Sequence, residues 1–128
     1  MKKIILLLFV ALLGFASCSN KQFPQSGTSI GYSQLQEMTT KGKLNLIDVR
    51  TEGEYKSGHI PGATHIDVLQ EASFLQQIQQ LDQSKSYVLI CQSGRRSKTA
   101  MRLMQEKGFK KVVDLDGGMN GWKGNTEK

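Results

Sequence analysis

Three short apolar runs, separated by segments of helical period, constrain the fold of this chain more than any other feature. The clearest run is Tyr87-Val88-Leu89-Ile90, and the other two cover residues 44–49 and 112–115. Continuous apolar runs of this length are typical of strands that are buried on both faces of a sheet. Apolar residues recur at helical spacing elsewhere, namely Phe74, Ile78 and Leu81 in one segment and Ala100, Leu103 and Met104 in another. Strands that alternate with helices predict an α/β fold around a mostly parallel sheet.

Local signals predict the shorter elements. Ser33-x-x-Gln36 and Thr51-x-x-Glu54 both fit the capping-box pattern, which predicts a helix up to about Thr40 and a second helix of about two turns. The other expected elements are a short strand within 63–68, a helix over 71–81, a helix that Gly108 stops, and a final turn or short helix at Trp122. A chain of 128 residues with these elements fits one domain.

The first residues of the chain have the pattern of a secretory signal peptide. Lys2 and Lys3 form a positive start, and an apolar stretch over residues 4–16 follows. The run Phe-Ala-Ser-Cys over residues 15–18 resembles the cleavage box of bacterial lipoproteins. We therefore expect cleavage before Cys18 and a lipid on that cysteine. An ordinary signal peptide cleaved nearby and a short anchoring helix are the alternatives.

These patterns predict the organisation of the whole chain. We expect a signal peptide over 1–17, a lipid-anchored flexible linker over 18–28, one domain over 29–124 and a short tail over 125–128. Acyl chains on Cys18 tether a domain to a membrane far more strongly than a modest positive charge does. The expected protein is thus an exported, membrane-anchored lipoprotein that faces the periplasm, with the inner and the outer membrane both open. A monomer is the default expectation.

The charge of the chain points to small anions rather than to nucleic acid. The formal net charge is +6, and it becomes +4 without Lys2 and Lys3. Seven basic residues and one acidic residue fall within 95–111, and such a stretch attracts small anions. The basic residues are not interleaved with stacking aromatic residues, so nucleic-acid binding is not expected.

Cys91 would be the only free thiol of the chain if Cys18 carries a lipid. It is either an inert buried residue or a reactive thiol, and its neighbours favour the reactive thiol. It directly follows the strand predicted at 87–90, and a helix is expected to begin within about five residues. Ligands of open α/β sheets bind at the carboxyl ends of strands, where a loop that enters a helix points N–H groups at an anion. Such a helix N-terminus and nearby arginine lower the pKa of a thiol, so Cys91 is predicted to be nucleophilic.

The residues after Cys91 supply groups that bind an anion. Arg96 stands five positions after the cysteine and offers a fork of donors that suits oxyanions. Gly94 allows a tight turn and a close approach of the backbone to a ligand. The predicted site therefore has Cys91 as the catalytic residue and, as substrate-binding residues, Gln92, Ser93, Gly94, Arg95 and Arg96.

This loop resembles the active-site loop of rhodanese-type sulfurtransferases, which reads C-x-x-G-x-[RT]. Two further blocks agree with this family and stand in the expected order. The first holds Leu46-Ile-Asp-Val-Arg50, Glu54-Tyr55 and Gly58-His-Ile-Pro-Gly-Ala63, and the second holds Asp116-Gly-Gly118 followed by Gly121-Trp122. The resemblance covers about residues 29–123, which is nearly the whole predicted domain.

The resemblance implies a single rhodanese-like domain, with a five-stranded parallel sheet and helices on both faces. It implies that Cys91 takes a sulfane sulfur from a small anionic donor such as thiosulfate, and passes it from a persulfide to a thiol or cyanide acceptor. It implies no metal and no organic cofactor. Many loops of the family carry arginine directly after the cysteine, whereas Gln92 stands here, which leaves the donor preference open. His59 is expected to fix a turn, and Asp48 and Arg50 to pair or to brace the loop.

Two other kinds of function use the same cysteine. A sulfur carrier or a redox-sensing module would hold sulfur or respond to oxidation at Cys91. A Cys-dependent phosphatase is less favoured, because that chemistry typically uses C-x5-R and the sixth residue after Cys91 is Ser97.

Overall fold

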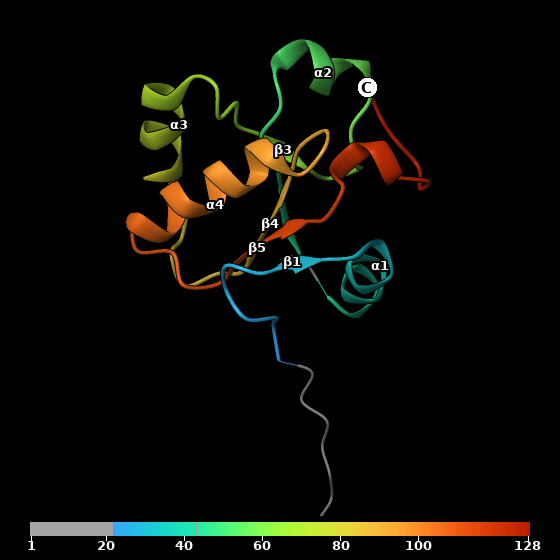
Figure 1. Cartoon of the computed structure of the whole chain (residues 1–128), viewed down its shortest axis with the longest axis horizontal. Coiled ribbons are helices and arrows are strands. Elements are labelled where there is room, and N and C mark those ends of the chain that lie inside the picture. Colours follow the sequence, from blue (N-terminus) through green and yellow to red (C-terminus); the bar gives the residue numbers. More distant parts are fainter. Residues whose placement is uncertain (1–21, 43) are drawn as a thin grey trace, which may run out of the picture.

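Five short strands form one parallel sheet at the centre of the structure (Figure 1). The structure is a computed structural model that describes residues 22–42 and 44–128. The spatial order of the strands is β1-β5-β4-β2-β3, and every neighbouring pair is parallel. Their bounds are Ser29–Ile30 for β1, Asn45–Asp48 for β2, Thr64–His65 for β3, Tyr87–Ile90 for β4 and Val112–Leu115 for β5. The prediction of a five-stranded parallel sheet is confirmed, and β4 and β5 have the predicted bounds.

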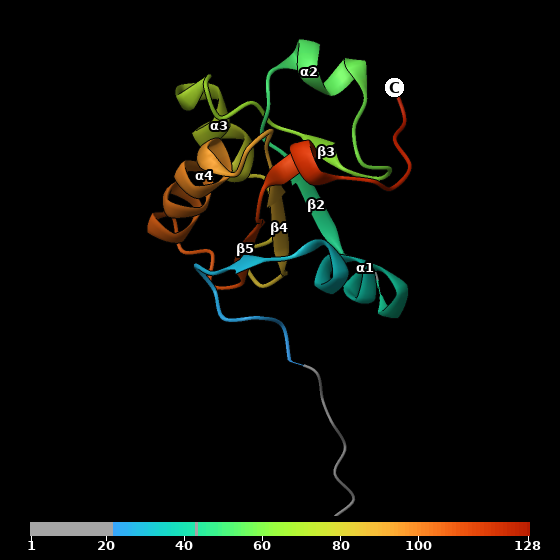
Figure 2. The ribbon, with the colours of Figure 1, turned by 45° about the vertical axis from the view of Figure 1, so that its right-hand side comes forward.

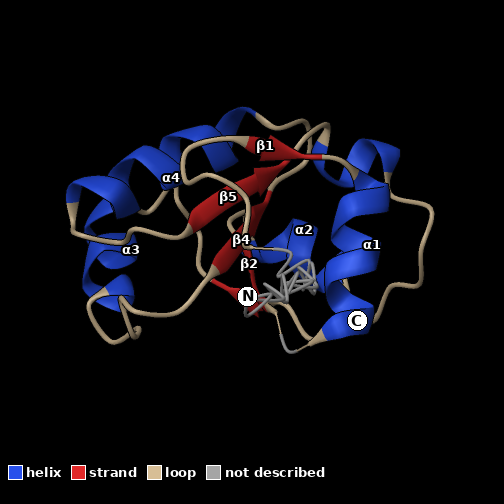
Figure 3. Cartoon of the chain, turned by 90° about the horizontal axis from the view of Figure 1, so that it is seen from below, coloured by secondary structure: helices blue, strands red, loops and turns tan. Residues whose placement is uncertain are grey.

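Helices cover both faces of this sheet, as predicted. α1 (Tyr32–Lys41) lies on one face, whereas α3 (Glu71–Ile78) and α4 (Arg95–Glu106) lie on the other, and the views in Figures 1, 2 and 3 agree on this. α2 (Glu52–Ser57) follows the carboxyl end of β2, and the 3-10 helix η1 (Gly118–Gly121) follows the carboxyl end of β5. Both therefore lie at the edge of the sheet where Cys91 follows β4.

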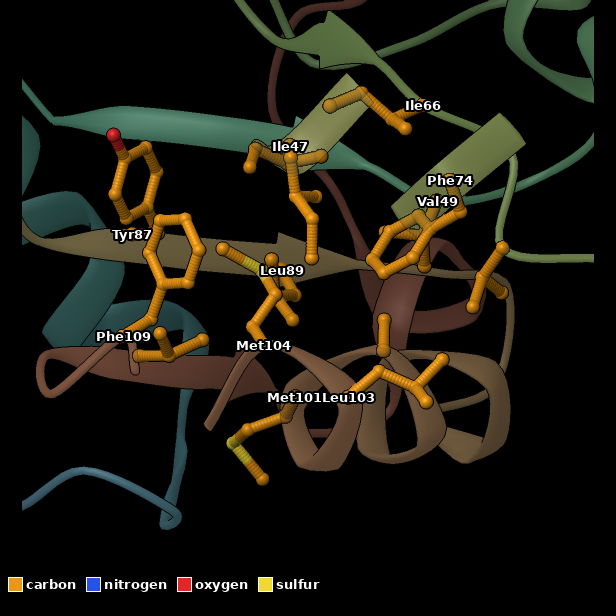
Figure 4. Packing of buried hydrophobic residues seen from close by; sticks show 14 of the residues in the cluster. Ile47, Val49, Ile66, Phe74, Tyr87, Leu89, Met101, Leu103, Met104 and Phe109 are labelled. Atoms are coloured by element: carbon orange, nitrogen blue, oxygen red, sulfur yellow. The ribbon is translucent and has the colours of Figure 1, made fainter. Parts of the chain in front are cut away.

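The central strand β4 contributes to a core on each face of the sheet. Tyr87 and Leu89 belong to the core under α3 and α4, whereas Val88 and Ile90 belong to the core under α1. Successive side chains of a strand point to opposite faces, so a strand that is covered on both faces is apolar throughout. Figure 4 shows the first core, in which residues of α3 and α4 pack against β2 and β4. The two cores fix β4, and with it the position of the residue that follows it.

The structure corrects the predicted start of α1. The N-cap of this helix is Gly31, with extended backbone at φ −83° and ψ 168°, and no side chain caps it. Ser33 lies inside the helix, so the capping box predicted there is wrong. The box predicted at Thr51 is confirmed, because its hydroxyl accepts from the Glu54 N–H while the Glu54 carboxylate accepts from the Thr51 N–H.

Three elements also differ from the sequence predictions in extent. α3 ends at Ile78 rather than near residue 81, and β3 has two residues within the predicted range 63–68. β1 has no counterpart among the predicted elements, because two residues at a sheet edge create no apolar period.

Residues outside the predicted limits of the domain pack on it. The Gly27 N–H donates to Val112 O over 2.9 Å, and Glu127 forms an antiparallel bridge with His59. Part of the predicted linker is therefore attached to β5, and part of the predicted tail is attached to the turn after α2. The predicted signal peptide over 1–17 and the predicted lipid site at Cys18 lie outside the described residues. In the described part of the chain, no helix has the length and apolar character that crossing a membrane requires.

Candidate active site

Cys91 lies where the central strand, a tight loop and a helix N-terminus meet. It directly follows β4, and α4 begins at Arg95. Gly94, the N-cap of α4, has a φ of 94°, in the left-handed region that glycine adopts without strain. This turn directs the Gly94 N–H at the sulfur, with 3.0 Å between N and Sγ. Since Cys91 is fully buried, its sulfur faces donors of the loop rather than bulk water.

Hydrogen bonds around the sulfur outweigh the effect of its burial. Burial raises the pKa of the Cys91 thiol, but hydrogen bonds from Ser97, Gly94 and Ser93 together bring that pKa below its usual value. The Ser97 hydroxyl lies 3.4 Å from Sγ. A lower pKa increases the thiolate fraction at neutral pH, and the thiolate is the nucleophilic form. The direction agrees with the expectation from the sequence.

Backbone hydrogen bonds connect the 3-10 helix η1 to the loop that begins at Cys91. The Met119 N–H donates to Cys91 O over 2.8 Å, and the Asn120 N–H donates to Gln92 O over 2.9 Å. Gly118 has a φ of 53°, and a Cβ atom at this position would collide with Cys91 O. The second glycine of the Asp-Gly-Gly block thus allows the backbone of η1 to approach the loop that begins at Cys91.

The Gln92 side chain forms hydrogen bonds with two neighbouring side chains. Its Oε1 accepts from Arg50 Nη1 over 3.1 Å, and its Nε2 donates to Asn120 Oδ1 over 2.7 Å. Arg50 also forms a buried ion pair with Asp48 at 2.8 Å. The expectation that Asp48 and Arg50 pair is confirmed, and Arg50 braces the loop through Gln92 as well. The Gln92 amide is therefore engaged within the protein, and its role in substrate binding stays a prediction.

Arg96 pairs with a carboxylate that is not among the predicted site residues. Its Nη1 and Nη2 donate to the two carboxylate oxygens of Glu54 on α2, over 2.7 and 2.8 Å. The hydrogen bond from Arg96 is the largest cause that lowers the pKa of Glu54 to about 2. The stability from this pair is therefore complete above the ordinary carboxyl pKa of about 4.5 and is lost as the pH falls toward 2. The pair ties the start of α4 to α2 at neutral pH.

A surface hollow of about 420 Å³ lies over the loop. Its lining residues are Ser93, Arg95, Arg96 and Thr99. Three of the five predicted binding residues thus line one hollow, while Gly94 contacts the sulfur and Gln92 lies between Arg50 and Asn120. Two of the lining residues are arginines, whose charge suits an anionic ligand. In the described part of the chain, no cluster of His, Cys, Asp and Glu side chains could hold a metal ion.

His59 fixes the turn after α2, as expected. Its Nδ1 lies 3.0 Å from Tyr55 O, and its ring stacks on that of Tyr55 with 3.7 Å between centroids. Its Nε2 faces the Glu127 carboxylate at 3.3 Å. These contacts give His59 a structural role, which agrees with the expectation from the sequence.

For three supporting residues, no signal in the sequence indicates the partner in the site. Glu54 is 42 positions from Arg96 along the chain, and Asn120 is 28 positions from Gln92. Asp114 lies in β5 and accepts a hydrogen bond from Ser97 over 2.8 Å. Only the parallel order of the sheet brings these distant residues to the loop.

Known proteins share both the sequence pattern and the fold. The family model described as "Rhodanese-like domain" matches residues 32–125. Thiosulfate sulfurtransferase GlpE of Shewanella oneidensis is 32% identical over 93 residues, which cover 73% of this chain and 89% of GlpE. YtwF of Bacillus subtilis, a proposed sulfurtransferase, is 41% identical over 85 residues, covering 66% of this chain and 79% of YtwF.

A further relative from Bacillus subtilis, YrkF, is a proposed sulfur carrier protein. It is 39% identical over 92 residues, which cover 72% of this chain but 48% of YrkF, so the chain spans about half the length of that relative. Among solved structures, SSP1007 of Staphylococcus saprophyticus superposes with a TM-score of 0.69 at 28% identity, covering 79% of this chain and 99% of SSP1007. The match of the family model, together with these relatives, shows that the chain belongs to the family of rhodanese-like domains.

Proposed function

We propose that this protein is a sulfurtransferase that moves a sulfane sulfur from a small anionic donor such as thiosulfate to a thiophilic acceptor. The observation that supports it most is the sulfur of Cys91 at the N-terminus of α4, with the Gly94 N–H 3.0 Å away and the thiol pKa lowered. Its relationship to the thiosulfate sulfurtransferase GlpE points to the same donor. The hollow lined by Arg95 and Arg96 suits the charge of that donor.

The proposed cycle has two steps and needs no external oxidant. The Cys91 thiolate attacks the outer sulfur of thiosulfate, the S–S bond of the donor breaks, and sulfite leaves with the electron pair. The product is a persulfide anion on Cys91, to which the Gly94 N–H and the other loop donors offer hydrogen bonds. Cyanide or a thiolate acceptor then attacks the outer sulfur and restores the Cys91 thiolate.

An intact-mass measurement tests this cycle directly. The full chain with Cys18→Ser has Cys91 as its only thiol, since the sequence holds two cysteines. After incubation with thiosulfate, its mass is expected to rise by one sulfur atom, and cyanide is expected to remove that increment and release thiocyanate. A chain that gains no sulfur from thiosulfate or from other sulfane donors would contradict the proposal.

Arg96 is expected to matter more for an anionic donor than Arg102, which also belongs to α4. Arg96→Ala removes the pair with Glu54 and the charge that acts on Cys91, whereas Arg102→Ala removes only an exposed pair with Glu106. Charged hydrogen bonds contribute about 1.5–3 kcal/mol, so kcat/KM for thiosulfate should fall about 10- to 100-fold for Arg96→Ala. Arg102→Ala is the matched control and should change kcat/KM for thiosulfate by less than about twofold. Equal losses in the two variants would reduce Arg96 to a general contributor of charge.

Sulfur carriage is the second candidate function. It is supported by the similarity to YrkF and by the complete burial of Cys91, which would shield a persulfide between transfers. Stoichiometric loading of Cys91 with slow release to cyanide and small thiols would favour carriage for a partner protein. Rapid multiple turnover with the same acceptors would favour the enzyme.

We also propose that the mature protein is a lipoprotein, anchored through Cys18 and facing the periplasm. The support is the sequence pattern of residues 1–18, with its positive start, apolar stretch and Phe-Ala-Ser-Cys box. Cys18→Ser is expected to shift the protein out of the membrane fraction and to block incorporation of labelled palmitate, with sulfur transfer unchanged. Membrane partitioning equal to that of the unaltered chain would contradict the lipid anchor.

A further inference from the structure

One buried carboxylate in the middle of the fold plays no part in the proposed cycle. Asp114 belongs to β5, whose four residues are all buried, and its side chain is fully inaccessible. A buried charge costs several kcal/mol unless it is paired and hydrogen bonded. Ser29 Oγ donates to one of its oxygens over 2.5 Å, and Ser97 Oγ donates to the other over 2.8 Å. The second of these donors leads to the catalytic sulfur.

The Ser97 hydroxyl lies between two groups that compete for it. It is 2.8 Å from Asp114 Oδ2 and 3.4 Å from Cys91 Sγ, and all three residues are fully buried. A hydroxyl has one hydrogen, so it donates to one acceptor at a time. When that hydrogen faces Asp114, Ser97 Oγ can only accept from the protonated thiol. When it faces Cys91, it stabilises the thiolate.

Two cations of α4 act on this arrangement. Lys98 Nζ lies 3.3 Å from Asp114 Oδ2, with its side chain half exposed, and Arg96 interacts with Cys91 through its charge. Ser29, from β1, is neutral and holds the other carboxylate oxygen. Asp114 therefore keeps two partners, Ser29 and Lys98, when Ser97 turns toward the sulfur.

We propose that Asp114 is a positioning residue that controls the protonation of Cys91 through the orientation of the Ser97 hydroxyl. The proposal rests on the proposed function of Cys91 as the sulfur-accepting nucleophile. In the resting enzyme the thiol donates to Ser97, and Ser97 donates to Asp114. When the thiol loses its proton to solvent, the hydroxyl turns to the thiolate and Asp114 retains Ser29 and Lys98. No proton is placed on Asp114, and no other bond changes.

The test is the pH titration of Cys91 in a double-mutant cycle. The thiolate of the full chain with Cys18→Ser is followed by its ultraviolet absorbance, with a Cys91→Ala variant subtracted to remove the tyrosine signal. Asp114→Asn keeps the shape of the side chain but competes less for the hydroxyl, so the pKa of Cys91 should fall by about one unit. In a Ser97→Ala background, Asp114→Asn should shift the titration midpoint of Cys91 by less than half as much. Asp116→Asn, an exposed neighbour with the same change of charge, is the control and should leave the midpoint unchanged.

Equal shifts with and without the Ser97 hydroxyl would overturn the proposal, because they would show that Asp114 acts by charge alone. An unchanged midpoint in Asp114→Asn would overturn it as well.

A second variant, Ser29→Ala, keeps the test valid if Asp114→Asn does not fold. Ser29 is an exposed edge residue that donates only to Asp114 Oδ1, the oxygen that Ser97 does not contact. Without the Ser29 hydroxyl, Asp114 should compete more strongly for the hydrogen of the Ser97 hydroxyl, so the titration midpoint of Cys91 should rise. This rise should disappear in a Ser97→Ala background. A Cys91 midpoint that does not rise in Ser29→Ala would contradict the proposal. The titration needs no sulfur donor, so its outcome is separate from success or failure of sulfur transfer.

Discussion

Cys91→Ser is expected to abolish sulfur transfer completely while the fold is kept. The hydroxyl of serine can accept the Gly94 N–H that now donates to Sγ over 3.0 Å and can bond to Ser97, so no buried polar group is left unpaired. A serine hydroxyl at this position stays protonated at neutral pH and forms no persulfide. Thiocyanate production should therefore fall to the rate of the reagents alone, and no sulfur should appear in the intact mass.

The matched control for this prediction is the other cysteine. Cys18→Ser alone should keep full transfer, because Cys18 lies outside the domain that holds the loop. Circular dichroism and urea unfolding of Cys91→Ser and Cys91→Ala establish that the loss is chemical rather than structural. Transfer that persists in both folded variants would show that the sulfur is accepted elsewhere and would remove Cys91 from the mechanism.

The sequence was sufficient to predict where the Cys91 loop lies in the fold, because the determinants of that position are local. Cys91, Gly94 and Arg96 lie within six residues, directly after an apolar run that is buried on both faces. A strand of this kind can only be central, and the residue after it can only lie at the carboxyl edge of the sheet. The structure places Gly94 at the helix N-terminus with positive φ, as a tight turn requires.

The supporting contacts could not be predicted because they depend on the order of the strands. Glu54 meets Arg96, and Asp114 meets Ser97, only after β2, β4 and β5 have assembled side by side. In the sequence, Glu54 belongs to a capping box and Asp114 interrupts an apolar strand. Neither pattern indicates which residue the carboxylate will contact, since hydrogen-bond partners across parallel strands have no fixed sequence spacing.

The capping box predicted at Ser33 failed for a related reason. Ser and Gln at this spacing fit the pattern, but Gly31, with its extended backbone, already begins the helix one residue after β1. The tertiary constraint of a short edge strand therefore set the start of α1, and local propensity did not.

The largest effect on stability is expected for Asp48→Ala. Asp48 and Arg50 form an ion pair whose side chains are 1% and 5% exposed, and Arg50 also donates to Gly58 O and to Gln92. Removal of the carboxylate leaves a guanidinium buried without its counter-charge, which typically costs about 3–5 kcal/mol. Urea unfolding should therefore show a loss of that size in the free energy of unfolding. Sulfur transfer should fall too, because Arg50 links this pair to the residue next to Cys91.

An exposed pair of the same kind is the matched control. Glu52 and Lys56 form an i, i+4 pair on α2 with both side chains 70% exposed, and solvent screens such pairs so that they contribute little to stability. Glu52→Ala should thus leave the free energy of unfolding nearly unchanged. The double variant Asp48→Ala with Arg50→Met removes both charges and should regain part of the loss, because no unpaired charge is then buried. If Asp48→Ala destabilised the protein no more than Glu52→Ala does, the Asp48–Arg50 pair would not be what stabilises this end of β2 and the Cys91 loop beside it.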